Sequence, residues 1–146
     1  MDMTAPMRAG LGFLTAVLAV LIFHQAMWGA LFLAGVMPFG PYPMRPVPPY
    51  GVPLIASLCF WGGLYGAAFG LLAPRLPRAP LWLLGLGLGV LAALVGWFVV
   101  APIKGQPLAG GFDPARMLVS LAINGFWGIG VGVIMPFLMP TALRRA

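Results

Sequence analysis

The chain has 146 residues, of which 62% are hydrophobic and 7% are charged, with a formal net charge of +6 and a mean hydropathy of +1.03. An ordinary soluble domain has about a quarter of its residues charged, so this composition excludes a water-soluble globular protein. The eight basic residues are scattered among the predicted connections and do not form a patch with interleaved aromatics, so we expect no nucleic-acid partner.

A membrane-spanning helix needs about 20 mostly apolar residues. Four stretches of this kind lie between charged or proline-rich breaks, at about residues 10–35, 54–72, 81–101 and 115–138. The first is too long for the apolar core of a signal peptide, so we expect it to be a retained helix. The sequence therefore predicts an all-α polytopic membrane protein, with residues 1–146 forming one four-transmembrane-helix bundle in the lipid bilayer.

The connection at residues 37–53 contains seven prolines. Proline fixes φ and lacks an N–H, so this segment is expected to be extended, with neither helix nor ladder strand. Phe39, Tyr42 and Tyr50 are aromatic side chains of the kind found at the headgroup level. We expect the segment, called the strap below, to lie along the outer interface. In the second connection, Asp113 and Pro114 are typical of a helix start.

Glycines recur one turn apart in the second and fourth spans, and this spacing favours close helix packing over the lining of a pore, because no polar stripe accompanies it. The tripeptide Phe60-Trp61-Gly62 returns as Phe126-Trp127-Gly128, which predicts two repeated helical hairpins with the same orientation. The predicted packing glycines are Gly62, Gly66, Gly70, Gly128 and Gly132.

The distribution of basic residues predicts the orientation of the spans. With four alternating helices, Arg8, Arg75, Arg78, Arg144 and Arg145 fall on one side, and Arg45, Lys104 and Arg116 fall on the other. The positive-inside rule then places both termini in the cytoplasm.

The chemically active side chains are few. The chain has one histidine, one cysteine and no glutamate, and its two carboxylates, Asp2 and Asp113, lie outside the spans. This set does not supply a catalytic carboxylate pair, a Ser-His-Asp triad or a clustered metal site, so we expect no enzyme, no metal site and no cofactor. A proton-coupled carrier would also lack an intramembrane acid.

The polar residues expected inside the spans are His24, Gln25, Asn124 and Ser57. At 1.5 Å per residue, His24 and Asn124 lie at similar depths below the outer ends of their helices, so the two side chains can meet. One interpretation is interhelical hydrogen bonding. The other makes His24 an axial ligand of a haem or chlorophyll.

Phe23-His24-Gln25, the run from Pro46 to Pro53 and Phe60-Trp61-Gly62-Gly63 together resemble a family of small four-span inner-membrane proteins predicted in many proteobacteria. The resemblance covers roughly the first half of the chain. It implies a bacterial inner membrane and carries no known activity.

Three functional hypotheses follow from these features. The first is a non-catalytic accessory, assembly or structural subunit that packs against itself or against other membrane-protein subunits through its glycine-rich faces. The second is a small homo-oligomeric carrier or channel for an apolar or weakly polar solute. The third is haem or pigment binding through His24.

Overall fold

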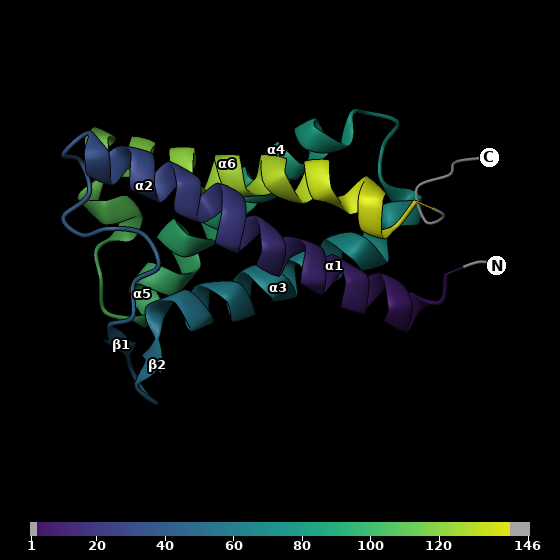
Figure 1. Cartoon of the computed structure of the whole chain (residues 1–146). Coiled ribbons are helices and arrows are strands. Elements are labelled where there is room, and N and C mark those ends of the chain that lie inside the picture. The colour runs from purple at the N-terminus through teal and green to yellow at the C-terminus, as the bar shows by residue number, and fades with distance from the viewer. Residues whose placement is uncertain (1–2, 141–146) are drawn as a thin grey trace.

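The computed structural model describes residues 3–140, so Asp2, Arg144 and Arg145 lie outside the described residues. Four long helical spans run side by side, three of them with a short segment of different helical geometry (Figure 1). The spans are α1 (Ala5–Ala19) continuing through the π-helix η1 (Val20–His24) into α2 (Gln25–Leu33); α3 (Leu54–Leu72) with the 3₁₀ turn η2 (Ala73–Arg75); α4 (Leu81–Val95) continuing through the π-helix η3 (Gly96–Val100) into α5 (Ala101–Ile103); and α6 (Pro114–Leu138).

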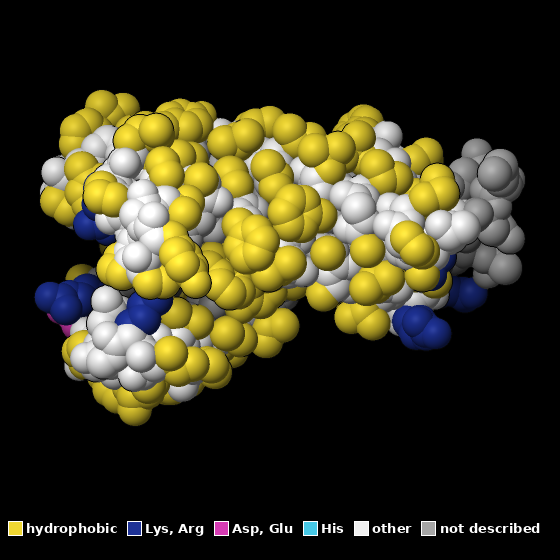
Figure 2. Space-filling view, turned by 90° about the horizontal axis from the view of Figure 1, so that it is seen from below, with side chains coloured by type: hydrophobic (Ala, Val, Ile, Leu, Met, Phe, Trp, Pro, Cys, Tyr) yellow, Lys and Arg dark blue, Asp and Glu magenta, His cyan; other side chains and the backbone are white. Residues whose placement is uncertain are grey.

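All four spans are long and apolar enough to cross a membrane. The all-α, four-span prediction is therefore confirmed, and the chain is an integral membrane protein with a lipid-facing surface. Figure 2 shows hydrophobic side chains over most of one face, with the Lys and Arg side chains gathered at its two ends. This distribution matches an apolar slab between two polar layers.

Side-chain caps explain where the first and last spans begin. The Thr4 hydroxyl accepts a hydrogen bond from the Met7 N–H, so the first helix begins at Ala5, about one and a half turns before the predicted start. Asp113 caps α6 and Pro114 is its first residue, which confirms the predicted helix start.

The four spans form two helical hairpins. α1 packs along α3, α4 packs along α6, and the hairpins meet where α1 and η1 contact α6. α3 and α4 contact each other only slightly, so the helices follow the order α3, α1, α6, α4, with α3 and α4 at the edges. The first helix of each hairpin contains one π-helical segment, a shared feature that the tripeptide repeat did not reveal.

The core lies where the two hairpins meet. Ala16, Val20, Trp127, Val131 and Met135 are buried there. The indole N–H of Trp127 donates a hydrogen bond of 3.1 Å to the Ala16 carbonyl, so the polar end of this aromatic side chain is satisfied inside the membrane. The second copy of the repeated tripeptide therefore holds the hairpins together.

The strap differs from the prediction because it contains a short ladder. β1 (Pro46–Val47) pairs antiparallel with β2 (Val52–Pro53), and the Pro48–Pro49 peptide bond is cis. Proline lacks an N–H, but non-proline residues donate the flanking hydrogen bonds: Gly51 to Val47, and Leu54 to Arg45. The prediction of no ladder strand was wrong because the prolines occupy positions where no ladder donor is needed.

The third span extends two residues beyond its predicted end, to Ile103. Pro102 lies inside this extension, where its ring would clash with a regular helix. The preceding π-helix widens the chain, and the Ala101 N–H donates to the Gly96 carbonyl five residues earlier. A 3₁₀ turn, η4 (Leu108–Gly111), follows in the loop to α6.

Candidate functional site

His24 and Gln25 are buried side by side on the first span, with exposed fractions of 7% and 1%. The Gln25 amide has two partners: its Oε1 accepts the Tyr42 N–H at 2.6 Å, and its Nε2 lies 3.1 Å from Nδ1 of His24. Because the amide oxygen already accepts from the strap, the amide nitrogen is the donor to His24. The histidine ring therefore accepts at Nδ1 and carries its proton on Nε2.

The π-helix η1 provides a backbone acceptor next to this pair. In a regular helix the Gln25 N–H would donate to Leu21, but here it reaches Val20 and Ile22. The Leu21 carbonyl accepts the Tyr42 hydroxyl instead, at 2.7 Å. Leu21 lies twelve residues before Leu33, about 18 Å along the helix, so Tyr42 reaches well below the outer end of the span.

Tyr42 has a φ of +56°, in the left-handed region. This conformation is unfavourable for a bulky residue that is neither glycine nor asparagine. It accompanies two hydrogen bonds from the same residue, one from the backbone and one from the side chain. The contacts with the first span are therefore strong enough to hold a strained backbone.

A second set of contacts lies nearer the outer end. The indole N–H of Trp28 donates a hydrogen bond of 2.9 Å to the Phe39 carbonyl, and the centres of the two rings lie 5.3 Å apart. The His24 ring stacks on Trp28 with the ring centres 5.9 Å apart, and the Arg45 guanidinium sits 4.7 Å from the Phe39 ring centre. We call the group formed by the first span and the strap the strap anchor, consisting of Leu21, His24, Gln25, Trp28, Phe39 and Tyr42.

The strap in turn satisfies the start of α3. The residue before that helix, Pro53, has no side-chain cap. Carbonyls of the strap accept the first helical N–H groups, with Leu54 donating to Arg45 and Ile55 to Pro43. A free helix end is costly next to hydrocarbon, so the strap completes the second span as well as covering the first.

The other two predicted polar residues lie outside the strap anchor. The Asn124 amide donates a hydrogen bond of 2.9 Å to the Ser120 carbonyl of its own helix. It does so although α6 passes next to η1, which contains His24. Ser57 is half-buried on α3. Among residues 3–140, the side-chain hydrogen bonds of His24 and Asn124 therefore run to Gln25 and Ser120, and not to each other.

The predicted glycines lie on the helix contacts within the chain. A Cβ on Gly66 or Gly70 would collide with the backbone of α1 at Gly12 or Arg8. A Cβ on Gly128 or Gly132 would collide with the backbone of α4 at Gly85 or Leu81. Gly62 faces Val20 and the Trp127 indole.

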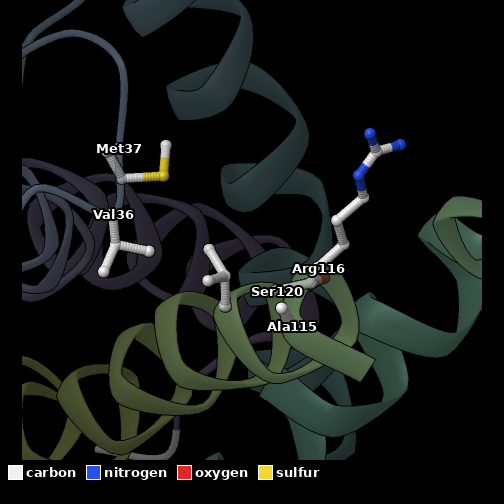
Figure 3. A pocket seen from close by; sticks show the side chains of 6 residues that line it. Val36, Met37, Ala115, Arg116 and Ser120 are labelled. Atoms are coloured by element: carbon white, nitrogen blue, oxygen red, sulfur yellow. The ribbon is translucent and has the colours of Figure 1, made fainter. Parts of the chain in front are cut away.

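An apolar cavity of about 320 Å³ opens between the end of the first span and the start of α6 (Figure 3). Its lining residues are Val36, Met37, Ala115, Arg116, Val119 and Ser120. The Arg116 guanidinium points away from the other lining side chains in Figure 3. His24 and Gln25 are not among the lining residues, so the cavity lies apart from them.

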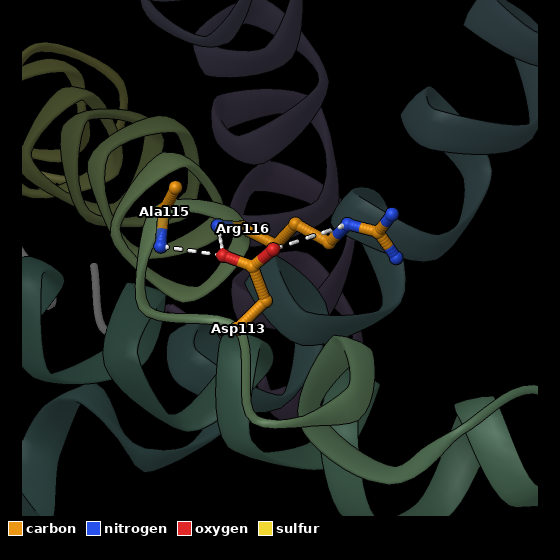
Figure 4. Close-up of polar contacts among 3 residues, drawn as sticks. All are labelled: Asp113, Ala115 and Arg116. Atoms are coloured by element: carbon orange, nitrogen blue, oxygen red, sulfur yellow. Dashed lines mark hydrogen bonds and ion pairs between the residues drawn. The ribbon is translucent and has the colours of Figure 1, made fainter.

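The mouth of this cavity is next to the α6 cap. Oδ1 of Asp113 accepts the N–H groups of Ala115 and Arg116 at 2.8 and 3.3 Å, and Oδ2 lies 3.8 Å from Nε of Arg116 (Figure 4). Both side chains are well exposed, so their ion pair contributes at most about 1 kcal/mol. The carboxylate acts chiefly as a helix cap.

Comparison with known proteins adds no assignment: no family model matches the chain, and no curated protein or solved structure is significantly similar to it. The resemblance noted above is therefore supported by the four spans alone.

The sequence indicated His24 and Gln25 as candidate site residues. It did not predict the contacts that Tyr42, Trp28 and Phe39 make in the strap anchor. The available signal was a buried polar pair in a span followed by a proline-rich segment too long for a simple turn. The π-helix that frees Leu21 has no comparable signature.

Proposed function

We propose that this protein is a non-catalytic accessory or structural subunit that associates with other membrane-protein chains in the bilayer. The observation that carries this proposal is the use of the buried polar side chains of the first span. His24, Gln25 and Trp28 hold the strap, and large hydrophobic side chains are exposed along all four spans. Such a molecule offers helix faces for association, and its polar groups act in its own assembly.

The same contacts favour a structural role for His24 over an axial-ligand role. A ligating imidazole must offer an unprotonated nitrogen to the metal. In the strap anchor Nδ1 already accepts from Gln25, and Nε2 carries the proton. Ligation through Nε2 would move the proton to Nδ1, and the Gln25 amide would then have to turn its oxygen to His24, which would leave the Tyr42 N–H without an acceptor.

A carrier role has less support than association. The described cavity is lined mainly by apolar side chains at one end of the bundle, and its lining does not include His24, Gln25 or Asn124. A solute path would need polar groups continuing from that cavity through the spans.

The proposed location is a bacterial inner membrane with both termini in the cytoplasm. Arg8, Arg75 and Arg78 lie at the end of the bundle opposite the strap, and Arg144 and Arg145 follow the last span in the sequence. The end of the bundle with the strap carries Arg45, Lys104 and Arg116, and Arg116 is paired with Asp113. This difference favours the strap on the outer side.

Native-size analysis tests the proposed association. The tagged protein is extracted from its native membranes in several mild detergents, and the mass of the protein part is measured. The expected species is larger than the 15.4 kDa chain, either as an oligomer or with another membrane protein. The proposal would be contradicted by a strictly monomeric protein in every mild detergent and in vesicles with the protein-to-lipid ratio of the native membrane.

A further inference from the structure

The cavity between the first span and α6 has an apolar interior and a charged rim. Val36, Met37, Ala115 and Val119 supply apolar side chains, and Arg116 is the one charged residue among the six described lining residues. Its guanidinium lies at the edge and points away from the other lining side chains (Figure 3). A molecule that filled the cavity would therefore contact apolar groups inside and a positive charge at the rim.

The outer nitrogens of the Arg116 guanidinium are available to an anion. Nε lies 3.8 Å from Oδ2 of Asp113, whereas Nη1 and Nη2 point away from that carboxylate (Figure 4) and have no partner among residues 3–140. The Arg116 side chain is 72% exposed, so an anion can reach it. A planar guanidinium binds phosphate oxygens in pairs, which makes phosphate a suitable partner.

Ser120 adds a hydroxyl one turn further into the span. It follows Arg116 by four residues, so it lies on the same side of α6 and about 6 Å deeper. Its side chain is half-buried, and the hydroxyl forms no hydrogen bond with any other residue in the range 3–140. From the rim inward, the site therefore presents a cation and then a hydroxyl among apolar side chains. A phospholipid presents its phosphate, its ester carbonyls and the start of its acyl chains in the same order.

The size and position of the cavity limit what it can hold. An apolar cavity of about 150 Å³ binds one benzene molecule, so a volume of about 320 Å³ suits the upper part of one acyl chain. The cavity lies where the first span ends and α6 begins, at the headgroup level. Inorganic phosphate would leave the apolar lining uncovered, and a zwitterionic lipid would bring its own cation to compete with Arg116.

We propose that this cavity binds one anionic phospholipid. The phosphate binds Nη1 and Nη2 of Arg116, and an ester carbonyl accepts the Ser120 hydroxyl. The upper part of one acyl chain packs against Val36, Met37 and Val119. This site is separate from the strap anchor, and it does not depend on the proposed association with other chains.

Mass spectrometry of the intact protein–lipid complex, released from detergent micelles, tests the phosphate contact. The probes are phosphatidylglycerol and phosphatidylcholine with the same acyl chains, and the first phosphatidylglycerol is expected to bind more tightly. Arg116→Gln is expected to lower that affinity by roughly three- to ten-fold, because a basic residue near the membrane surface contributes about five-fold. Lys104→Gln removes the same charge outside the cavity lining and is expected to leave the affinity nearly unchanged.

A variant of the helix cap is expected to have the opposite effect. Asp113→Asn keeps a side chain that can cap α6 but removes the negative charge beside Arg116. The affinity for phosphatidylglycerol is therefore expected to rise. A fall as large as that of Arg116→Gln would contradict the phosphate contact.

Two phenylalanine variants test the acyl-chain contact. Val119→Phe adds bulk inside the cavity, whereas Leu118→Phe adds it at the preceding residue, which is 66% exposed and outside the lining. Only Val119→Phe is expected to weaken phosphatidylglycerol binding, by roughly three- to ten-fold, because the chain loses its packing. The melting temperature without added lipid shows whether each variant remains folded.

Three results would overturn the proposed site. Equal affinities for the two lipids, or equal losses in Arg116→Gln and Lys104→Gln, would show that Arg116 does not select an anionic headgroup. Unchanged binding in a folded Val119→Phe protein would show that no acyl chain enters the cavity. Displacement of phosphatidylglycerol by an equal concentration of inorganic phosphate would indicate a site for small anions alone.

Discussion

Gln25 connects two parts of the molecule that are far apart in the sequence. Its amide oxygen accepts the backbone N–H of Tyr42 in the strap, and its amide nitrogen orients His24 on the first span. Gln25 is 1% exposed, and both ends of its amide are satisfied. It is difficult to replace, because loss of the amide oxygen or of the amide nitrogen leaves a partner group without its hydrogen bond.

Gln25→Leu is expected to destabilise the folded protein by about 1–3 kcal/mol, because the Tyr42 N–H and His24 Nδ1 lose their partners. The variant should also expose the strap to chymotrypsin after Phe39, which is half-buried in the folded protein. Cleavage rate in detergent and the melting temperature measure the two effects. Ser57→Ala is the control, and an equal loss of stability in both variants would contradict a specific role for Gln25.

Tyr42→Phe removes only the hydroxyl that donates to Leu21. The expected loss is about 0.5–1.5 kcal/mol, the usual net contribution of one hydrogen bond. Tyr50→Phe is the matched control, since Tyr50 is in the same strap and is 89% exposed. If thermal unfolding shows the two variants to be equally stable, the Tyr42 hydroxyl does not contribute.

At the scale of helices, the two hairpins show how far sequence can predict this fold. Hydropathy and proline placement predicted the four spans because hydrocarbon requires long apolar helices between polar breaks. The strap anchor was not predicted, because Tyr42 meets Leu21 only through a freed carbonyl and an unusual backbone conformation. The strap ladder was missed because its prolines avoid the donor positions.

Close contact between helices predicts a sharp difference between two glycines of α1. A Cβ on Gly12 would collide with the Gly66 carbonyl, whereas a Cβ on Gly10 would meet nothing within 4 Å. Gly12→Ala is expected to cost about 1–3 kcal/mol through overpacking. Gly10→Ala is expected to be neutral or slightly stabilising, because alanine favours helix.

Thermal unfolding of the two glycine variants in one detergent provides the comparison. Equal melting temperatures would mean that α1 and α3 can separate by the width of a methyl group without loss.

At the scale of the whole molecule, the order α3, α1, α6, α4 leaves an edge at each side and one strap at one end. The basic residues at the end opposite the strap favour that end as cytoplasmic. The orientation determines which compartment the strap and the apolar cavity face.

Labelling with a membrane-impermeant maleimide tests the orientation in a Cys59→Ser background. Met44→Cys in the strap, where Met44 is 68% exposed, is expected to react in intact cells. Ala79→Cys, in the connection between α3 and α4, is expected to react only after lysis. The reverse pattern would mean that the strap is cytoplasmic.

The central structural claim is that the strap folds back on the first span and is held there. A Cβ on Gly29 would lie 4.0 Å from Cβ of Pro41, within the range that a disulfide requires. Gly29→Cys with Pro41→Cys, in the Cys59→Ser background, is therefore expected to form an intramolecular disulfide under mild oxidation.

Mass spectrometry of the alkylated protein measures this directly. The oxidised double variant is expected to lose both free thiols, remain a single chain and regain the thiols on reduction, while each single variant keeps its thiol. Two freely alkylated thiols after oxidation, or disulfides only between chains, would contradict the anchoring of the strap to the first span.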